Sequence, residues 1–369
     1  MPELESLVDE AQRQFTICNA CRYCEDYCAV FPAAERRSLF LSGDLGYLAN
    51  VCHDCRACYQ ACMYTDPHEF AINIPALMSE ARVASYQEHS RPRWLAGLFE
   101  RGPLALGLLT SVSIVALVAI QQLTSGADLF EARSGPGSFY EVVSHEAMVI
   151  PGLLISIWAV AILGGGFLSF WRDSGGTWRQ IMNPSLWRQA TREAATMRWM
   201  RGGGGECHFP EEERPSPVRR RLHGLVMWGF LLTFAATVAA AFMNQVLGQL
   251  PPYGWLSAPV LFGFTGGVMI LVGGVGLLRL KAKSPPDLIH PGSGRMDRTF
   301  LVSLLAVTVT GLALLFLRDT AAMGVLLLVH LATVLVLFVT APYGKMVHGV
   351  YRIAAILKSC HERDLERRG

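Results

Sequence analysis

The sequence CNACRYCEDYC, residues 18–28, and its counterpart CHDCRACYQAC, residues 52–62, decide the fold of the N-terminal part of this chain. Each run has the spacing C-x2-C-x2-C-x3-C. Three closely spaced thiolates can ligate three iron atoms of a [4Fe–4S] cubane, and in two-cluster ferredoxins the fourth cysteine ligates the other cluster. One predicted cluster therefore has the ligands Cys18, Cys21, Cys24 and Cys62, and the other has Cys52, Cys55, Cys58 and Cys28.

The same residues allow an alternative metal and an alternative ferredoxin fold. Paired cysteines also bind structural zinc, but eight cysteines in two sets of four with this spacing fit cubanes better. The usual proline after the fourth cysteine is absent, since Ala29 and Met63 stand there. The intervening segment AAERRSLFLSGDLGYLANV looks helical. These features favour an α-helical ferredoxin domain over residues 1–90 rather than a small ferredoxin that contains β-strands.

The cysteine distribution and the N-terminus indicate a reducing compartment for this domain. Eight of the ten cysteines fall within the first 62 residues, which is typical of metal ligation rather than of a disulfide framework. The N-terminal sequence MPELESLVDEAQRQF lacks the basic and apolar regions of a secretory signal, so we expect the domain to stay in the cytoplasm. The net charge of +2 gives no overall field that would favour nucleic acid.

Six apolar segments follow, each close to the roughly 20 residues that cross a bilayer. The chain is 51% hydrophobic and only 17% charged, and six such segments are hard to bury in a soluble protein. We therefore predict an all-α protein whose residues 104–358 form a six-helix transmembrane bundle. The expected spans are residues 104–123, 147–171, 222–247, 256–280, 299–317 and 321–341. Residues 91–103 are expected to be an interfacial linker, as a surface helix or a plain connection, and residues 359–369 a cytoplasmic tail.

The basic residues of the loops predict the orientation of the bundle. Loops 172–221 and 281–298 and the tail after the sixth span are rich in arginine and lysine, whereas loops 124–146, 248–255 and 318–320 are poor in them. Basic loops stay in the cytoplasm. We therefore expect a multi-pass protein of a bacterial-type inner membrane, with both termini and the cysteine-rich domain on the cytoplasmic side.

Four histidines at the predicted spans are candidate haem ligands, since ionisable residues in spans are often functional. His330 and His348 are eighteen residues apart, which is five helical turns, so they share a face if the helix continues past Pro342. By depth, His223 pairs with His348 and His145 with His330, and each pair could hold a b-type haem. The alternative is that they are polar residues at helix ends. Five other histidines are predicted to be ordinary surface residues: His53, His68, His89, His290 and His361.

The glycine run at residues 202–205, followed by Glu206, Cys207 and His208, has neither the GK[ST] of a phosphate loop nor the strand context of a Rossmann turn. We predict a flexible loop there. Cys207 and Cys360 are predicted to be free thiols.

Together these motifs resemble the tricarballylate (citrate) utilisation protein B family. The resemblance rests on ICNACRYCEDYCAVFPA, VCHDCRACYQACMYTDPHEFAINIPAL, RWMRGGGGECHFPEEE, HGLVMWGFLLTFAATVAA and HLATVLVLFVTAPYGKMVHGVYR. It implies an inner-membrane protein that reoxidises the reduced flavin of an FAD-dependent tricarballylate dehydrogenase. It also implies that the eight cysteines are cluster ligands, and it matches His223, His330 and His348 to histidines of the family. Met243 and Asn244 stand where the family often has a further histidine, which argues against a second haem through that helix.

The sequence thus predicts an electron conduit that runs from a cytoplasmic flavoprotein through two [4Fe–4S] clusters and b-haem to membrane quinone. The alternatives are a subunit of a heterodisulfide-reductase-like or nitrate-reductase-like complex, and a membrane redox sensor, although a sensor would need an output domain. A transporter is disfavoured because the spans have few carboxylates and no obvious inverted repeat. No residue set predicts substrate chemistry, so we assign no catalytic residue.

Overall fold

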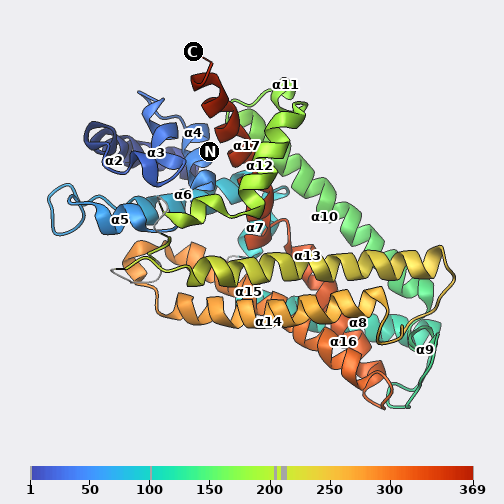
Figure 1. Ribbon diagram of the computed structural model, residues 1–369. Helices are drawn as coiled ribbons and strands as arrows, with labels where there is room; N and C mark the ends of the chain where they lie inside the picture. Colours follow the sequence, from blue (N-terminus) through green and yellow to red (C-terminus); the bar gives the residue numbers. More distant parts are fainter. Residues whose placement is uncertain (1, 100–101, 203–205, 209–213, 369) are drawn as a thin grey trace.

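The computed structural model describes residues 2–99, 102–202, 206–208 and 214–368. Over these residues the chain is built from helices and forms no strand, so the predicted all-α fold class is confirmed. Figure 1 shows the short N-terminal helices gathered at one end of the molecule and the long helices extending away from them. Both chain ends lie at the end that holds the N-terminal helices.

Short helices joined by tight turns form the cysteine-rich domain. Asn73 starts its longest helix, because its side-chain oxygen accepts a hydrogen bond from the Ala76 amide at 3.1 Å and Pro75 stands in the first turn. The helices of this part are α1 (Pro2–Ser6), α2 (Val8–Cys21), the 3₁₀ turn η1 (Glu25–Tyr27), α3 (Val30–Glu35), α4 (Ser42–Val51), α5 (Ala57–Ala61) and α6 (Ile74–His89). Helix α7 (Arg93–Phe99) leads to the long helices.

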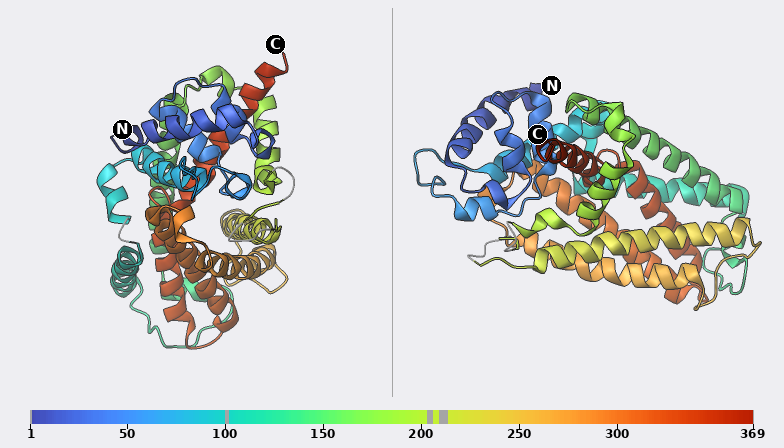
Figure 2. Two further views of the ribbon diagram at one scale, coloured as in Figure 1. Left: turned by 90° about the vertical axis from the view of Figure 1, so that its left-hand side faces the viewer. Right: turned by 45° about the horizontal axis from the view of Figure 1, so that its top comes forward.

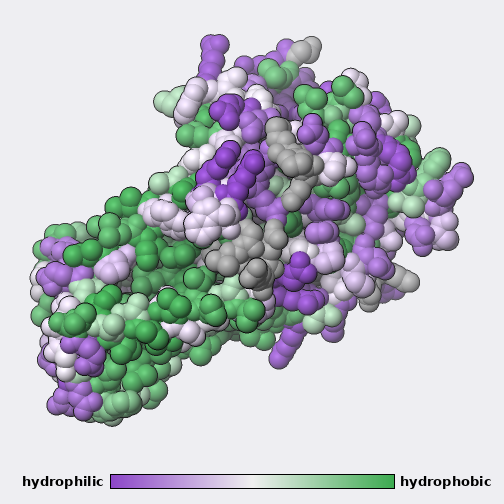
Figure 3. Space-filling model, turned by 180° about the vertical axis from the view of Figure 1, so that it is seen from behind, coloured by the Kyte–Doolittle hydropathy of each residue, from purple (hydrophilic) through white to green (hydrophobic). Residues whose placement is uncertain are grey.

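Six helices are long and apolar enough to cross a membrane, which makes this a multi-pass membrane protein. They are α8 (Pro103–Thr124), α10 (His145–Asp173), α13 (Val218–Gln245), α14 (Ala258–Ala282), α15 (Pro291–Leu317) and α16 (Met323–Thr340). Many of their apolar side chains face outward, as expected for lipid contact. Figure 3 shows this hydrophobic surface over the end with the long helices and a hydrophilic surface over the other.

Shorter helices occupy the connections. They are α9 (Ser138–Val142), α11 (Trp178–Ile181), α12 (Pro184–Ala195), η2 (Arg198–Arg201), η3 (Pro286–Leu288), η4 (Lys345–Val347) and α17 (His348–Glu366). Helix α17 runs without a break across the expected start of the tail at residue 359. It packs between α4 and α12 (Figure 2). Its Glu362 accepts hydrogen bonds from Arg37 at 2.8 Å and Tyr47 at 3.0 Å. Apolar side chains of α17 also belong to the hydrophobic core of the cysteine-rich domain.

Glycines let α13 and α14 pack closely along their length. A Cβ atom added to Gly266 would lie 2.6 Å from the Gly229 carbonyl oxygen, and one added to Gly273 would lie 2.6 Å from the Leu222 carbonyl oxygen. Small residues at such positions allow two backbones to approach in a membrane. The glycines therefore fix the α13–α14 hairpin, which carries His223 at one end.

We expect Gly266→Ala to destabilise the protein by about 1–3 kcal/mol, because the added methyl group must displace backbone that cannot move freely. Gly263→Ala is the matched control on the same helix, since its Cβ would lie 3.7 Å from the nearest atom, Ala236 Cβ. Alanine favours helix equally at both sites. Thermal unfolding in detergent measures the difference, and equal stabilities of the two variants would contradict this packing.

Candidate metal centres

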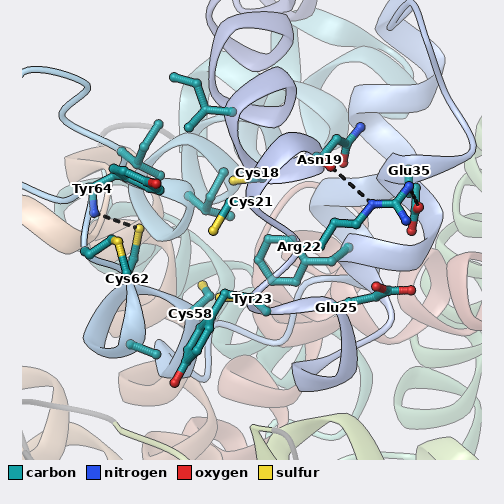
Figure 4. A pocket seen from close by; sticks show the side chains of 17 residues that line it. Cys18, Asn19, Cys21, Arg22, Tyr23, Glu25, Glu35, Cys58, Cys62 and Tyr64 are labelled. Atoms are coloured by element: carbon teal, nitrogen blue, oxygen red, sulfur yellow. Dashed lines mark hydrogen bonds and ion pairs between the residues drawn. The ribbon is translucent and has the colours of Figure 1, made fainter.

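The first predicted cysteine set lines a pocket at the surface of the N-terminal domain. Cys18 and Cys21 lie on the last turn of α2, Cys24 comes just before η1, and Cys62 follows α5. All four line one pocket, and three of them are seen with their neighbours in Figure 4. Burial, with the charges of Cys62, Cys24 and Cys21, raises the pKa of the Cys18 thiol to about 12. These four thiols therefore share one space, whose wall also includes Cys58 of the second run.

The second set lines a more enclosed pocket. Cys28, Cys52, Cys55 and Cys58 contribute to its wall. Burial, followed by the charges of Cys55 and Cys52, raises the pKa of Cys28 well above its usual value. Cys55 is 8% exposed, whereas Cys21 of the first set is exposed to solvent. We call the two groups the outer set and the inner set.

The two sets exchange their fourth cysteines, because Cys62 lies with the first run and Cys28 with the second. This is the grouping that the spacing predicts, and their role as cluster ligands stays a prediction. Thiolates are soft ligands that suit iron–sulfur clusters. Among the described residues, no three His, Cys, Asp or Glu side chains converge closely enough for one metal ion.

Three arginines from different helices hold the backbone of the inner set. Arg82 on α6 and Arg352 on α17 each donate a hydrogen bond from Nη2 to the Cys52 carbonyl oxygen, at 2.9 and 3.0 Å. Arg219 on α13 donates from Nη1 to the Asp54 carbonyl oxygen at 2.7 Å. Burial, followed by the charge of Arg82, lowers the pKa of Arg352 to about 10, so Arg352 is still charged at neutral pH.

His223 and His348 lie face to edge beside these arginines. Their ring centres are 6.2 Å apart and their ring planes meet at 84°. His223 stands four residues after Arg219 on α13, and Arg352 stands four residues after His348 on α17. Each helix therefore carries its histidine and its arginine on one face, one turn apart. The structure brings together these two predicted haem ligands and places them next to the inner set.

The surroundings of both imidazoles suit metal ligation. His348 Nδ1 lies 2.6 Å from the Lys345 carbonyl oxygen, so an Nδ1–H donor there leaves Nε2 as the lone-pair donor. Burial, followed by the charges of Lys345 and Arg352, lowers the pKa of His348 to about 3, which keeps the ring neutral. His223 Nδ1 is buried and has no hydrogen-bond partner among the described residues.

The chain does not continue as one helix from His330 to His348, so the condition for these two histidines to share a face is not met. Helix α16 ends at Thr340, and α17 begins at His348 after the η4 turn. Pro342 has no amide hydrogen for a helical bond and its ring crowds the preceding turn. The amides of Tyr343 and Gly344 instead donate to the Thr340 carbonyl oxygen. The break at Pro342 turns the chain before it reaches His348.

The structure does not bring His145 and His330 together. His145 opens α10 and its Nε2 lies 3.0 Å from Gln245 Nε2. His330 Nδ1 lies 3.1 Å from Thr310 Oγ1, and the ring lines a largely apolar cavity of about 490 Å³ between α13, α14, α15 and α16. Within the described residues, no ring contact or hydrogen bond joins the two histidines. His330 is therefore a polar group at a membrane cavity.

The glycine-rich loop, which the sequence predicted only to be flexible, contacts the inner set. The His208 amide donates to the Cys55 carbonyl oxygen at 2.9 Å, and the Cys207 thiol lies 3.3 Å from the same oxygen. A Cβ on Gly202 would lie 2.8 Å from Ala57 Cβ and 3.6 Å from Cys55 Sγ. Cys207 forms no disulfide, as expected, but it is fully buried. The remaining glycines, 203–205, lie outside the described residues.

Two histidines predicted for the surface are enclosed instead. His89 is 4% exposed, its Nδ1 lies 3.1 Å from Ser169 Oγ, and it joins α6 to α10. His53 is half-buried, its Nδ1 lies 2.8 Å from the Val51 carbonyl oxygen, and burial lowers its pKa well below the usual value. Both lie where the two parts of the chain pack together, a contact between distant segments that local sequence does not reveal.

Comparison with known proteins identifies the family of this chain. A family model described as citrate utilization protein B matches residues 97–369, and one described as citrate utilization protein B Fer4-like domain matches residues 11–88. The chain belongs to this family. The citrate utilization protein B of Escherichia coli is 37% identical over 382 aligned positions, which cover 100% of this chain and 98% of the relative. No solved structure matches.

The family confirms the resemblance seen in the sequence and covers both parts of the chain. The Fer4-like region, residues 11–88, contains all eight cysteines of the outer and inner sets. A Fer4-like domain indicates an iron–sulfur cluster, and the family assignment is consistent with iron–sulfur electron transfer.

Proposed function

We propose that this protein carries electrons from the reduced flavin of a partner dehydrogenase to quinone in the membrane. The observation that carries the proposal is the succession of the outer set, the inner set and the His223–His348 pair. Helices α13 and α17 link the last two, because each bears one of the histidines and an arginine that holds the inner cysteine loop. This succession forms a route from the surface toward the membrane helices.

The residues fit two [4Fe–4S] clusters and one b-haem, which would supply the one-electron sites. The outer set would hold one cluster and the inner set the other. His223 and His348 would be the haem ligands, since their rings lie close together, with centres 6.2 Å apart.

Electrons would be taken up at the outer set. Cys21 is exposed there, and two large side chains at the same pocket, Tyr23 and Met63, are 63% and 70% exposed. Exposed apolar groups around a redox site suit a protein partner. The relative's name refers to citrate utilization, so we propose a flavoprotein that oxidises tricarballylate or a similar tricarboxylate.

Electrons would leave in the membrane half. One reduced flavin supplies two electrons, and one quinone takes up two electrons and two protons to become a quinol. The cavity beside His330 has largely apolar walls with one imidazole and one guanidinium group, from Arg318, which suits a quinone ring and its apolar tail. The basic loops 172–221 and 281–298 support an inner-membrane location with both termini in the cytoplasm.

Vesicles that contain the full chain, the partner flavoprotein and its tricarboxylate are expected to reduce quinone. The rate should fall to that of empty vesicles with Cys62→Ala, because the outer set then lacks one thiol. Quinone absorbance measures the rate. Cys360→Ala is the control, since that buried thiol contacts Arg363 at 3.2 Å and belongs to neither set. An absence of quinone reduction with a competent, substrate-reduced flavoprotein would refute the proposal.

A further inference from the structure

The inner set has an unusual charge distribution at the backbone of Cys52. Two guanidinium groups, from Arg82 and Arg352, donate to the single neutral carbonyl oxygen of Cys52. Arg82 is only 4% exposed. In the described chain, neither arginine forms an ion pair with a carboxylate. Two cations held this close in an enclosed place repel each other, so the site favours an additional negative charge.

The outer set has a different environment. Cys21 is exposed, and water screens charges at that pocket. The basic side chain that lines it, Arg22, forms an ion pair with Glu35 of the same pocket. Glu25 adds an exposed carboxylate to the wall. The outer pocket therefore offers little unbalanced positive charge, whereas behind the inner set the buried Arg82 and the half-buried Arg352 both contact a ligand residue.

Reduction of an iron–sulfur cluster adds one electron and no ligand, so the negative charge of the cluster grows by one unit. Net charge, hydrogen bonding and solvent exposure are the features that set cluster potentials. A buried cation stabilises that added charge far more than a solvated cation does, because the local dielectric is low. The potential of the inner cluster should therefore respond strongly to Arg82 and Arg352.

We propose that Arg82 and Arg352 are positioning residues that hold the inner cluster at a higher reduction potential than the outer cluster, so that electrons move toward the membrane. The inference rests on the cluster assignment of the proposed function. In the step concerned, the outer cluster loses one electron and the inner cluster gains it, with no proton transferred. Arg352 lies on the same helix as His348, so that one helix both contacts the inner set and carries one histidine of the pair.

Redox titration of the purified full chain, followed by electron paramagnetic resonance, tests the proposal. We expect Arg82→Gln to lower the potential of the inner cluster alone, shifting the electron-sharing equilibrium between the clusters by about tenfold, which is about 59 mV for one electron. Arg82→Lys should retain most of the potential. The signal that remains in Cys62→Ala identifies the inner cluster.

Arg352→Gln should give the same shift, and Arg363→Gln is its matched control. Arg363 lies eleven residues further along α17, which is about three turns, and pairs with Glu193 at 2.8 Å. Its replacement should leave both potentials unchanged. If Arg82→Gln and Arg352→Gln leave the inner potential unchanged, or shift both clusters equally, the inference is wrong while the clusters themselves stand. A wild-type chain without two clusters would instead refute the proposed function. If either glutamine variant fails to fold, Arg82→Lys and the order of the two wild-type potentials decide, and an outer potential above the inner one overturns the proposal.

Discussion

Replacing both Cys24 and Cys62 with alanine is expected to remove one iron–sulfur cluster and to leave the other intact. The two residues come from different sequence runs but line the same pocket. Burial, followed by the charge of Cys62, raises the pKa of the Cys24 thiol to about 12. The double variant should therefore lose no more than either single variant does. Total iron should fall from about nine atoms to about five per chain, because about eight cluster atoms become about four and the haem iron stays, and one of two cluster resonance signals should disappear.

The matched double variant, Cys24→Ala with Cys28→Ala, should give the opposite result. These two residues belong to one sequence run but lie in different pockets, so both clusters should be damaged. If each run held its own cluster, the outcomes of the two double variants would be exchanged. Cys207→Ala is a further control, because its thiol contacts the Cys55 carbonyl oxygen rather than completing either set. Both signals should survive that change.

Replacing His348 with leucine is expected to abolish the absorbance of b-haem in the purified protein. Leucine is of similar size but offers no nitrogen, so a haem held by this pair would lose one of its two ligands. His223→Leu should have the same effect, because the two rings face each other at 6.2 Å. Reduced-minus-oxidised spectra and haem extraction measure the loss, while both cluster signals should remain.

His330→Leu tests the other pair that the sequence predicted, in which His145 and His330 hold haem. His330 lies against Thr310 and a membrane cavity, so its loss should leave the haem bands in place and affect quinone reduction. Full haem content in His348→Leu would contradict the proposed pair. A loss of haem in His330→Leu would show that His330 binds haem instead.

The sequence predicted the helical fold and the two groups of cysteines because both depend on local spacing. The apolar length of a span is set by the thickness of the bilayer, and the C-x2-C-x2-C-x3-C run is set by the shape of a cubane. His223 and His348 were paired by depth, since helices that start from the same side of a membrane bring their ends to one level. None of these inferences requires information about which helices are neighbours in the fold.

The sequence was less informative wherever distant segments meet. Helical periodicity would put His330 and His348 on one face only if the helix continued past Pro342, and the structure shows that the chain turns there. The loop that carries Cys207 looked flexible because its glycines have no preferred backbone conformation, yet Gly202 is needed where the loop presses on Ala57. Only packing against the inner set reveals that requirement.

The cysteine runs by themselves determined that this chain has two groups of four thiols, since covalent spacing limits where each sulfur atom can reach. The tertiary structure alone decided what surrounds each group. Arg82 of the cysteine-rich domain and Arg352 of the C-terminal helix are 270 residues apart in the chain, yet the fold brings both to the Cys52 carbonyl oxygen. Charge in a low-dielectric interior acts through space rather than along the sequence, so only the folded chain shows which group is exposed and which is surrounded by cations.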